Sequence, residues 1–102
     1  MNKSISIIVP VFNEAESINN LYIEILNYVK DINKFEIVFV DDGSSDNSSG
    51  VIKKIVENDT NVKLIRLYKN FGKADALSEG FNYCNGDYVI TMDADLQDDP
   101  AE

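Results

Sequence analysis

The chain has 102 residues, with 18 Asp and Glu against 9 Lys and Arg, and its formal net charge is −9. Such a field repels phosphate backbones and anionic lipid, which argues against nucleic-acid binding through a basic surface. With no histidine and only Cys84, the chain lacks a Ser-His-Asp triad, a histidine metal ligand and an intramolecular disulfide. Any metal would be held by oxygen ligands, which favours Mg, Mn or Ca.

Apolar residues along the chain alternate between the period of a strand and that of a helix. Residues 5–11 predict a buried strand rich in β-branched side chains. An apolar stripe over 18–29 predicts a helix, and we expect Asn13 to cap it in a capping box completed by Glu16. A second buried strand is predicted over 35–40, followed by a turn and another helix N-terminus.

The second half of the chain repeats this pattern. Residues 51–56 supply the inner face of the second helix, 62–67 predict a strand, 73–83 a helix and 87–92 a strand. The expected inner face of the third helix is Ala74, Leu77 and Phe81. The order β-α-β-α-β-α-β with apolar strands predicts an α/β fold, with a parallel sheet covered by helices on both faces.

Acidic clusters follow three of the predicted strands, at residues 10–14, 41–43 and 93–95. Because ligands of such sheets bind beyond the carboxyl ends of the strands, we expect these clusters to form one site. No transmembrane or signal-peptide pattern is visible, so the sequence favours a cytoplasmic location.

The D-x-D of Asp93 and Asp95 is the cluster whose spacing points most directly to metal binding. In an extended strand their side chains point the same way, with backbones roughly 6 to 7 Å apart, so both can approach one divalent cation. Gln97 could add a neutral oxygen. The alternative is a cap or a solvated turn, which is the commoner fate of an isolated D-x-D.

Two further pairs leave alternatives open. Of Asp41 and Asp42, only one can face the site from an extended strand, and the other would cap the turn or helix that follows. Lys69 and Lys73 form a cationic pair at the same edge, and either could contact a phosphate, the alternative being a solvated surface position.

The first cluster also allows ordinary structural roles for its residues. Pro10 ends the strand, where its missing N–H is harmless. Phe12 is either a core aromatic or a stacking surface for a base. Glu14 suits the dipole of a first helical turn, which alone could explain it.

Four segments together resemble the family 2 glycosyltransferases: residues 7–14, 38–46, 70–73 and 92–98. Their order and spacing are similar to the N-terminal, nucleotide-binding half of the GT-A fold. The D-A-D-L-Q form resembles the branch that contains dolichyl-phosphate mannose synthase and bacterial polyprenyl-phosphate sugar transferases. Phe12 departs from a frequent Tyr, and Lys69 from a frequent Arg.

The resemblance implies roles for individual positions. Nucleoside and diphosphate contacts are implied at Pro10, Phe12, Glu14, Val40, Asp42, Lys73, Asp93 and Ala94. A Mg or Mn ion is implied at Asp95, the principal ligand, with Asp93 and Gln97. Asp93 and Asp95 would serve catalysis through this cation, which neutralises the diphosphate leaving group.

The implied activity is inverting transfer of a sugar from a nucleotide-diphosphate sugar to a polyprenyl phosphate or a saccharide, in cell-envelope glycan synthesis. The full-length protein would work at the cytoplasmic face of the membrane. Residues 1–102 would be the donor half, inactive without an acceptor half. The exposed edge of such a sheet could also pair with a second copy.

Two other functions stay open. A receiver-like or phosphatase-like phosphotransfer module also gathers acidic residues around Mg²⁺ at strand ends. A non-catalytic remnant that binds nucleotide or metal is the second alternative.

Overall fold

The structure is a computed structural model that describes residues 3–94, so Asp95 and Gln97 lie outside the described residues. Its elements are β1 (Ser4–Val11), α1 (Ile18–Val29), β2 (Lys34–Asp41), α2 (Ser48–Asn58), β3 (Val62–Arg66), α3 (Lys73–Tyr83) and β4 (Tyr88–Thr91). The predicted order of strands and helices is confirmed.

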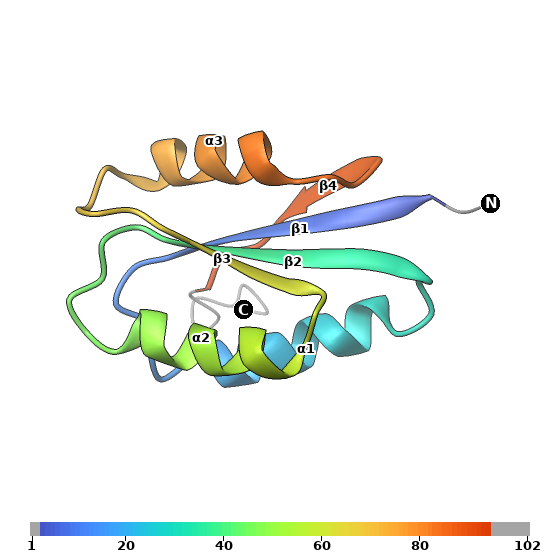
Figure 1. The fold of residues 1–102 in the computed structure, drawn as a ribbon, viewed down its shortest axis with the longest axis horizontal. Helices are drawn as coiled ribbons and strands as arrows, with labels where there is room; N and C mark the ends of the chain where they lie inside the picture. The colour runs from blue at the N-terminus through green and yellow to red at the C-terminus, as the bar shows by residue number, and fades with distance from the viewer. Residues whose placement is uncertain (1–2, 95–102) are drawn as a thin grey trace, which may run out of the picture.

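The strands form one parallel sheet in the order β3-β2-β1-β4. Helices α1 and α2 cover one face of this sheet and α3 covers the other (Figure 1). In the register, Pro10 lies beside Val40, and Ile8 lies beside both Val38 and Thr91. Because all four strands run the same way, their carboxyl ends open on one edge, as predicted for the site.

Alternate residues of the two central strands build two cores. Ile7, Val9 and Phe39 are fully buried on the face covered by α1 and α2. Ile8 and Val38 are fully buried in the smaller core under α3. Burying one such side chain contributes about 1.5–3 kcal/mol, so these strands fix the frame that carries the edge loops.

The predicted inner face of α3 is wrong at two positions. Ala74 and Phe81 are exposed, whereas Ala76 and Gly80 are buried. A Cβ on Gly80 would lie 2.5 Å from Cγ2 of Ile8. The helix therefore packs through Ala76 and Gly80, which allow its backbone to approach β1 closely, and Leu77 packs against the same core as predicted.

The predicted capping box before α1 is also wrong. The helix begins at Ile18, its N-cap is Ser17, and no side chain caps it. Asn13 instead has a left-handed backbone, with φ 54°. A turn over residues 15–17 separates it from the helix, so the side chain of Asn13 is available for another partner.

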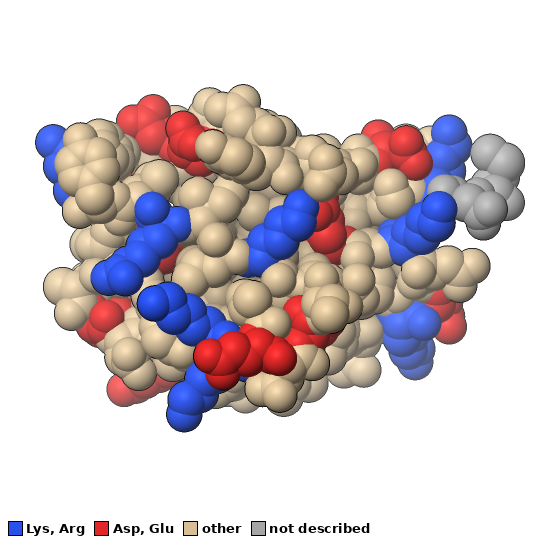
Figure 2. Space-filling model, in the orientation of Figure 1, with Lys and Arg blue, Asp and Glu red and all other residues tan. Residues whose placement is uncertain are grey.

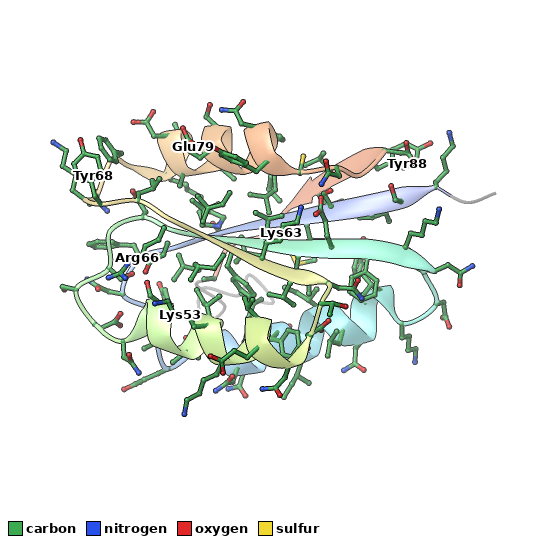
Figure 3. All side chains as sticks on the ribbon, in the orientation of Figure 1. Lys53, Lys63, Arg66, Tyr68, Glu79 and Tyr88 are labelled. Carbon is green, nitrogen blue, oxygen red and sulfur yellow. The ribbon has the colours of Figure 1, made fainter. Side chains whose placement is uncertain are left out.

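No helix within the described residues 3–94 is long and apolar enough to cross a membrane. On the face shown in Figure 2, Lys and Arg are interspersed with Asp and Glu. One ion pair joins β3 to β2, where Nζ of Lys63, which is labelled in Figure 3, lies 2.7 Å from Oε1 of Glu36.

Candidate functional site

A pocket of about 480 Å³ opens at the carboxyl edge of the sheet. It is lined by Pro10, Val11, Phe12, Glu14, Asp42, Asn70, Gly72, Lys73, Asp93 and Ala94. The lining comes from the ends of β1, β2 and β4 and from the start of α3. The structure therefore gathers most of the predicted site residues around one space.

Phe12 and Glu14 form the wall that follows β1. Phe12 is 44% exposed, which excludes the core alternative and leaves an aromatic residue at the rim of the pocket. Glu14 is half-buried and precedes α1 by a turn, so it does not occupy the first helical turn.

The two aspartates at the end of β2 have separate tasks. The carboxylate of Asp41 is buried and accepts hydrogen bonds from the N–H of Ser44, at 2.9 Å, and from the hydroxyl of Ser49. Asp41 thus caps the turn that leads into α2. Asp42, which is 4% exposed, lines the pocket instead.

The carboxylate of Asp42 holds the loop that precedes α3. It accepts hydrogen bonds from the N–H of Phe71 at 2.8 Å and of Gly72 at 3.0 Å. The side-chain amide of Asn70 donates a further bond to it at 3.2 Å. The loop would otherwise carry unpaired N–H groups, so this one carboxylate fixes its path along the pocket.

Gly43 allows the same loop to come close. Its φ is 77°, and a Cβ at this position would lie 2.3 Å from the carbonyl carbon of Lys69 and 2.4 Å from the nitrogen of Asn70. Both are backbone atoms that cannot swing away. Glycine is therefore required for the approach of these two loops.

The structure separates the two lysines of this edge. Lys73 lines the pocket and forms an ion pair with Asp93, and both side chains are more than half exposed. Lys69 does not line the pocket, and its ammonium lies over the rings of Tyr68 and Phe71, at 5.9 and 5.2 Å from their centroids. Tyr68 projects away from the body of the molecule (Figure 3). Of these two lysines, Lys73 is thus the one whose side chain lines the pocket.

One predicted residue is not at the pocket surface. Val40 is fully buried in the core under α3, so its part in nucleotide binding stays a prediction. Asn70 and Gly72 line the pocket, although the sequence assigned neither an individual role. The sequence did predict a loop at these two residues, between a strand and a helix. Their position at the pocket depends on contacts of that loop with Asp42 and Gly43, and no local sequence pattern reveals those contacts.

Within residues 3–94, no three acidic, cysteine or histidine side chains gather into a group that could hold a metal ion. Of the predicted ligands, Asp93 is the one that the structure describes, and its carboxylate lies at the pocket. An exposed carboxylate suits a hard cation such as Mg²⁺ or Mn²⁺. The described residues thus offer such a cation one carboxylate, which is ion-paired with Lys73, and Asp95 and Gln97 remain predictions.

Comparison with known proteins decides the family. A family model described as "Glycosyl transferase family 2" matches residues 6–102. The chain belongs to glycosyl transferase family 2. It is 41% identical over 100 residues to an undecaprenyl-phosphate 4-deoxy-4-formamido-L-arabinose transferase of Proteus mirabilis strain HI4320, covering 96% of this chain and 31% of that protein. The protein of the same name from Pseudomonas fluorescens strain SBW25 is 42% identical, with coverages of 96% and 29%.

Two solved structures share the fold. The mannosyltransferase PcManGT from Pyrobaculum calidifontis, in complex with GDP-Man and Mn²⁺, aligns with a TM-score of 0.74 and 30% identity over 93% of this chain and 28% of that chain. TarS 1–349 of S. aureus, in complex with UDP-GlcNAc, aligns with a TM-score of 0.73 and 27% identity, with coverages of 96% and 30%. The sheet described above is the N-terminal part of a GT-A fold.

Proposed function

We propose that this chain forms the donor side of a glycosyltransferase that moves a sugar from a nucleotide-diphosphate sugar to a polyprenyl phosphate. The observation that carries the proposal is the pocket that brings Phe12, Lys73 and Asp93 together at the carboxyl edge. The relatives named for undecaprenyl phosphate support this acceptor, with a saccharide second. The mannosyltransferase solved with GDP-Man and Mn²⁺ supports the donor class.

The nucleoside would lie against the wall built by β1 and β2. Phe12 offers an exposed ring on which a base can stack. A carboxylate has about four acceptor positions, and that of Asp42 already accepts three hydrogen bonds from the loop before α3. One position is left for an N–H or hydroxyl of the nucleoside, while Glu14 and Pro10 border the same space.

The diphosphate would lie between Lys73 and the D-x-D. On a chain with a net charge of −9, an anion binds only where cations reverse the local field. Lys73 supplies one positive charge, and we propose that Asp93, Asp95 and Gln97 hold a Mg²⁺ or Mn²⁺ ion. When bound, this ion neutralises the diphosphate leaving group, and inversion at the anomeric carbon is part of the proposal.

The chain spans about 31% of the Proteus relative, so the activity of a whole protein is proposed here and not assigned. We propose that residues 1–102 supply the donor part and do not transfer sugar alone. Steady transfer to a polyprenyl phosphate by this chain would contradict that division.

Calorimetry with UDP, GDP and their sugars, with and without Mn²⁺, tests the proposal. We expect binding of one nucleotide that requires the metal and is abolished by Asp95→Ala, whereas Asp31→Ala, an exposed carboxylate after α1, leaves it unchanged. Binding of none of these nucleotides would contradict a donor site, and of the non-catalytic alternative it would leave only a remnant that binds metal. Phosphorylation of an aspartate by a small acyl phosphate, detected as a mass gain, would instead favour phosphotransfer.

A further inference from the structure

The loops that follow β1 and β2 are tied to each other through Asn13. Its side-chain Oδ1 accepts hydrogen bonds from the N–H of Ser45 at 2.9 Å and of Asp46 at 3.2 Å. Its own N–H donates to the hydroxyl oxygen of Ser44 at 2.8 Å. Bonds therefore run in both directions between one residue of the first loop and three of the second.

The next two residues of the first loop continue the tie. The N–H of Glu14 donates to the hydroxyl oxygen of Ser48 at 3.0 Å, and the N–H of Ala15 donates to Oδ2 of Asp46 at 3.2 Å. Ser48 is fully buried at the start of α2, and its N–H and hydroxyl both donate to Oδ1 of Asp46. The N–H groups of three consecutive residues of the first loop thus donate hydrogen bonds to the segment that leads into α2.

The backbone of Asn13 explains why this residue type stands here. Among the described residues, it is the one non-glycine residue with a positive φ, at 54°. Asn tolerates this left-handed region better than most side chains, because its short polar group bonds locally. The turn at Asn13 lies between Phe12 and Glu14, which both line the pocket.

We propose that Asn13 is a positioning residue of the donor site: by fastening the first loop to the second, it holds Phe12 and Glu14 in place before a nucleotide binds. The inference rests on the proposed function, because it assigns Asn13 a task at that same site. A wall fixed in advance loses less conformational entropy on binding, which raises affinity. Asn13 itself is not among the residues that line the pocket.

Two substitutions of Asn13 distinguish the effect of its Oδ1 acceptor from the effect of its left-handed backbone conformation. Asn13→Gly keeps the left-handed turn accessible and removes Oδ1, whereas Asn13→Asp keeps both an acceptor and a tolerance for this turn. We expect Asn13→Gly to weaken binding of UDP or GDP with Mn²⁺ by about tenfold, and Asn13→Asp to restore most of it at raised ionic strength, which screens the added charge. Asn33→Gly is the matched control, because Asn33 is an exposed loop residue before β2, at the opposite edge.

Hydrogen exchange provides a readout that does not depend on a nucleotide. In Asn13→Gly we expect the amides of Ser45 and Asp46 to exchange at least about tenfold faster, and in Asn13→Asp to stay protected. Thermal unfolding of each variant shows whether affinity is measured on folded protein. Unchanged exchange of these amides, or unchanged affinity in Asn13→Gly, overturns the inference. If the wild-type chain binds neither nucleotide, the proposed function fails by itself, and exchange still decides whether Asn13 fixes the loop.

Discussion

Oδ1 of Asp42 accepts a hydrogen bond from the N–H of Phe71 at 2.8 Å, across 29 positions of sequence. This bond joins the end of β2 to the loop that delivers Lys73 to the pocket. The residue after β2 thus fixes the loop that positions the ammonium group of Lys73. The site therefore depends on hydrogen bonds between loops that are distant in sequence.

Removing this carboxylate should loosen the loop and destabilise the chain. In Asp42→Ala the part-buried N–H groups of Phe71 and Gly72 lose their acceptor, and we expect a cost of about 1 kcal/mol, the lower end of the range for a buried unpaired donor. Urea denaturation should show a loss of this size in the free energy of unfolding. Asp31→Ala, an exposed aspartate, should change it by less than about 0.5 kcal/mol. Equal stability of the two variants would show that the loop does not depend on Asp42.

Gly80→Ala should destabilise the packing of α3 on β1. The new Cβ would lie 2.5 Å from Cγ2 of Ile8, a buried atom held close to its own backbone. Overpacking costs about 1–3 kcal/mol, against a gain of up to about 1 kcal/mol in helix propensity. We expect a net loss of about 1 kcal/mol by chemical denaturation. Ser78→Ala, on the exposed side of the same helix, should not destabilise. A more stable Gly80→Ala variant would mean that the helix shifts without cost.

The Glu36 carboxyl should make stability depend on acid pH. Burial raises its pKa, but hydrogen bonds from Lys63, Ser6 and the N–H of Asn85 outweigh burial and hold the pKa below the ordinary value of 4.5. A carboxyl whose pKa is lower in the folded state stabilises the fold above the unfolded pKa, and this contribution is lost as pH falls through the folded value. The free-energy difference between wild type and Glu36→Gln should therefore shrink below about pH 4.5. A difference that stays constant from neutral to acid pH would contradict this.

The two lysines of the carboxyl edge should differ in nucleotide binding. Lys73 lines the pocket beside Asp93, whereas Lys69 lies over the rings of Tyr68 and Phe71 outside it. A hydrogen bond to a charged group contributes about 1.5–3 kcal/mol, so Lys73→Met should weaken UDP or GDP binding at least about tenfold. Lys69→Met makes the same change in net charge and should have little effect. An equal loss of nucleotide affinity in both variants would show that the lysines act through the overall electrostatic field and that Lys73 makes no specific contact with the nucleotide.

The sequence predicted those features of the fold that repeat along the chain. Strands and amphipathic helices each have a characteristic spacing of hydrophobic residues. The predicted boundaries of most elements therefore lie within a residue or two of those in the structure. The inner face of α3 was predicted correctly at Leu77 and missed at Ala76 and Gly80, small residues that hydrophobic periodicity does not detect.

Site residues that directly follow a strand could be predicted from the sequence. Those whose position depends on contacts with a distant loop could not. Phe12 and Asp93 stand directly after apolar strands, so the sheet edge could be expected to gather them. For Asn13 the local pattern predicts a helix cap, because Asn followed by Glu three positions later is a capping pattern. Its partners, Ser45 and Asp46, lie more than thirty positions away, and no local pattern identifies them.

Mapping a bound nucleotide by NMR tests the central claim most directly. The ¹⁵N-labelled chain would be titrated with UDP and with GDP in the presence of Mg²⁺, which does not broaden signals as Mn²⁺ does. We predict amide shifts at Val11, Phe12, Asn70, Gly72 and Ala94, which line the pocket at the carboxyl edge. Ser4, Asn85 and Gly86 line a smaller pocket of about 280 Å³ at the opposite edge and should not respond. Shifts confined to that opposite edge, or none with either nucleotide, would contradict a donor site at the carboxyl edge.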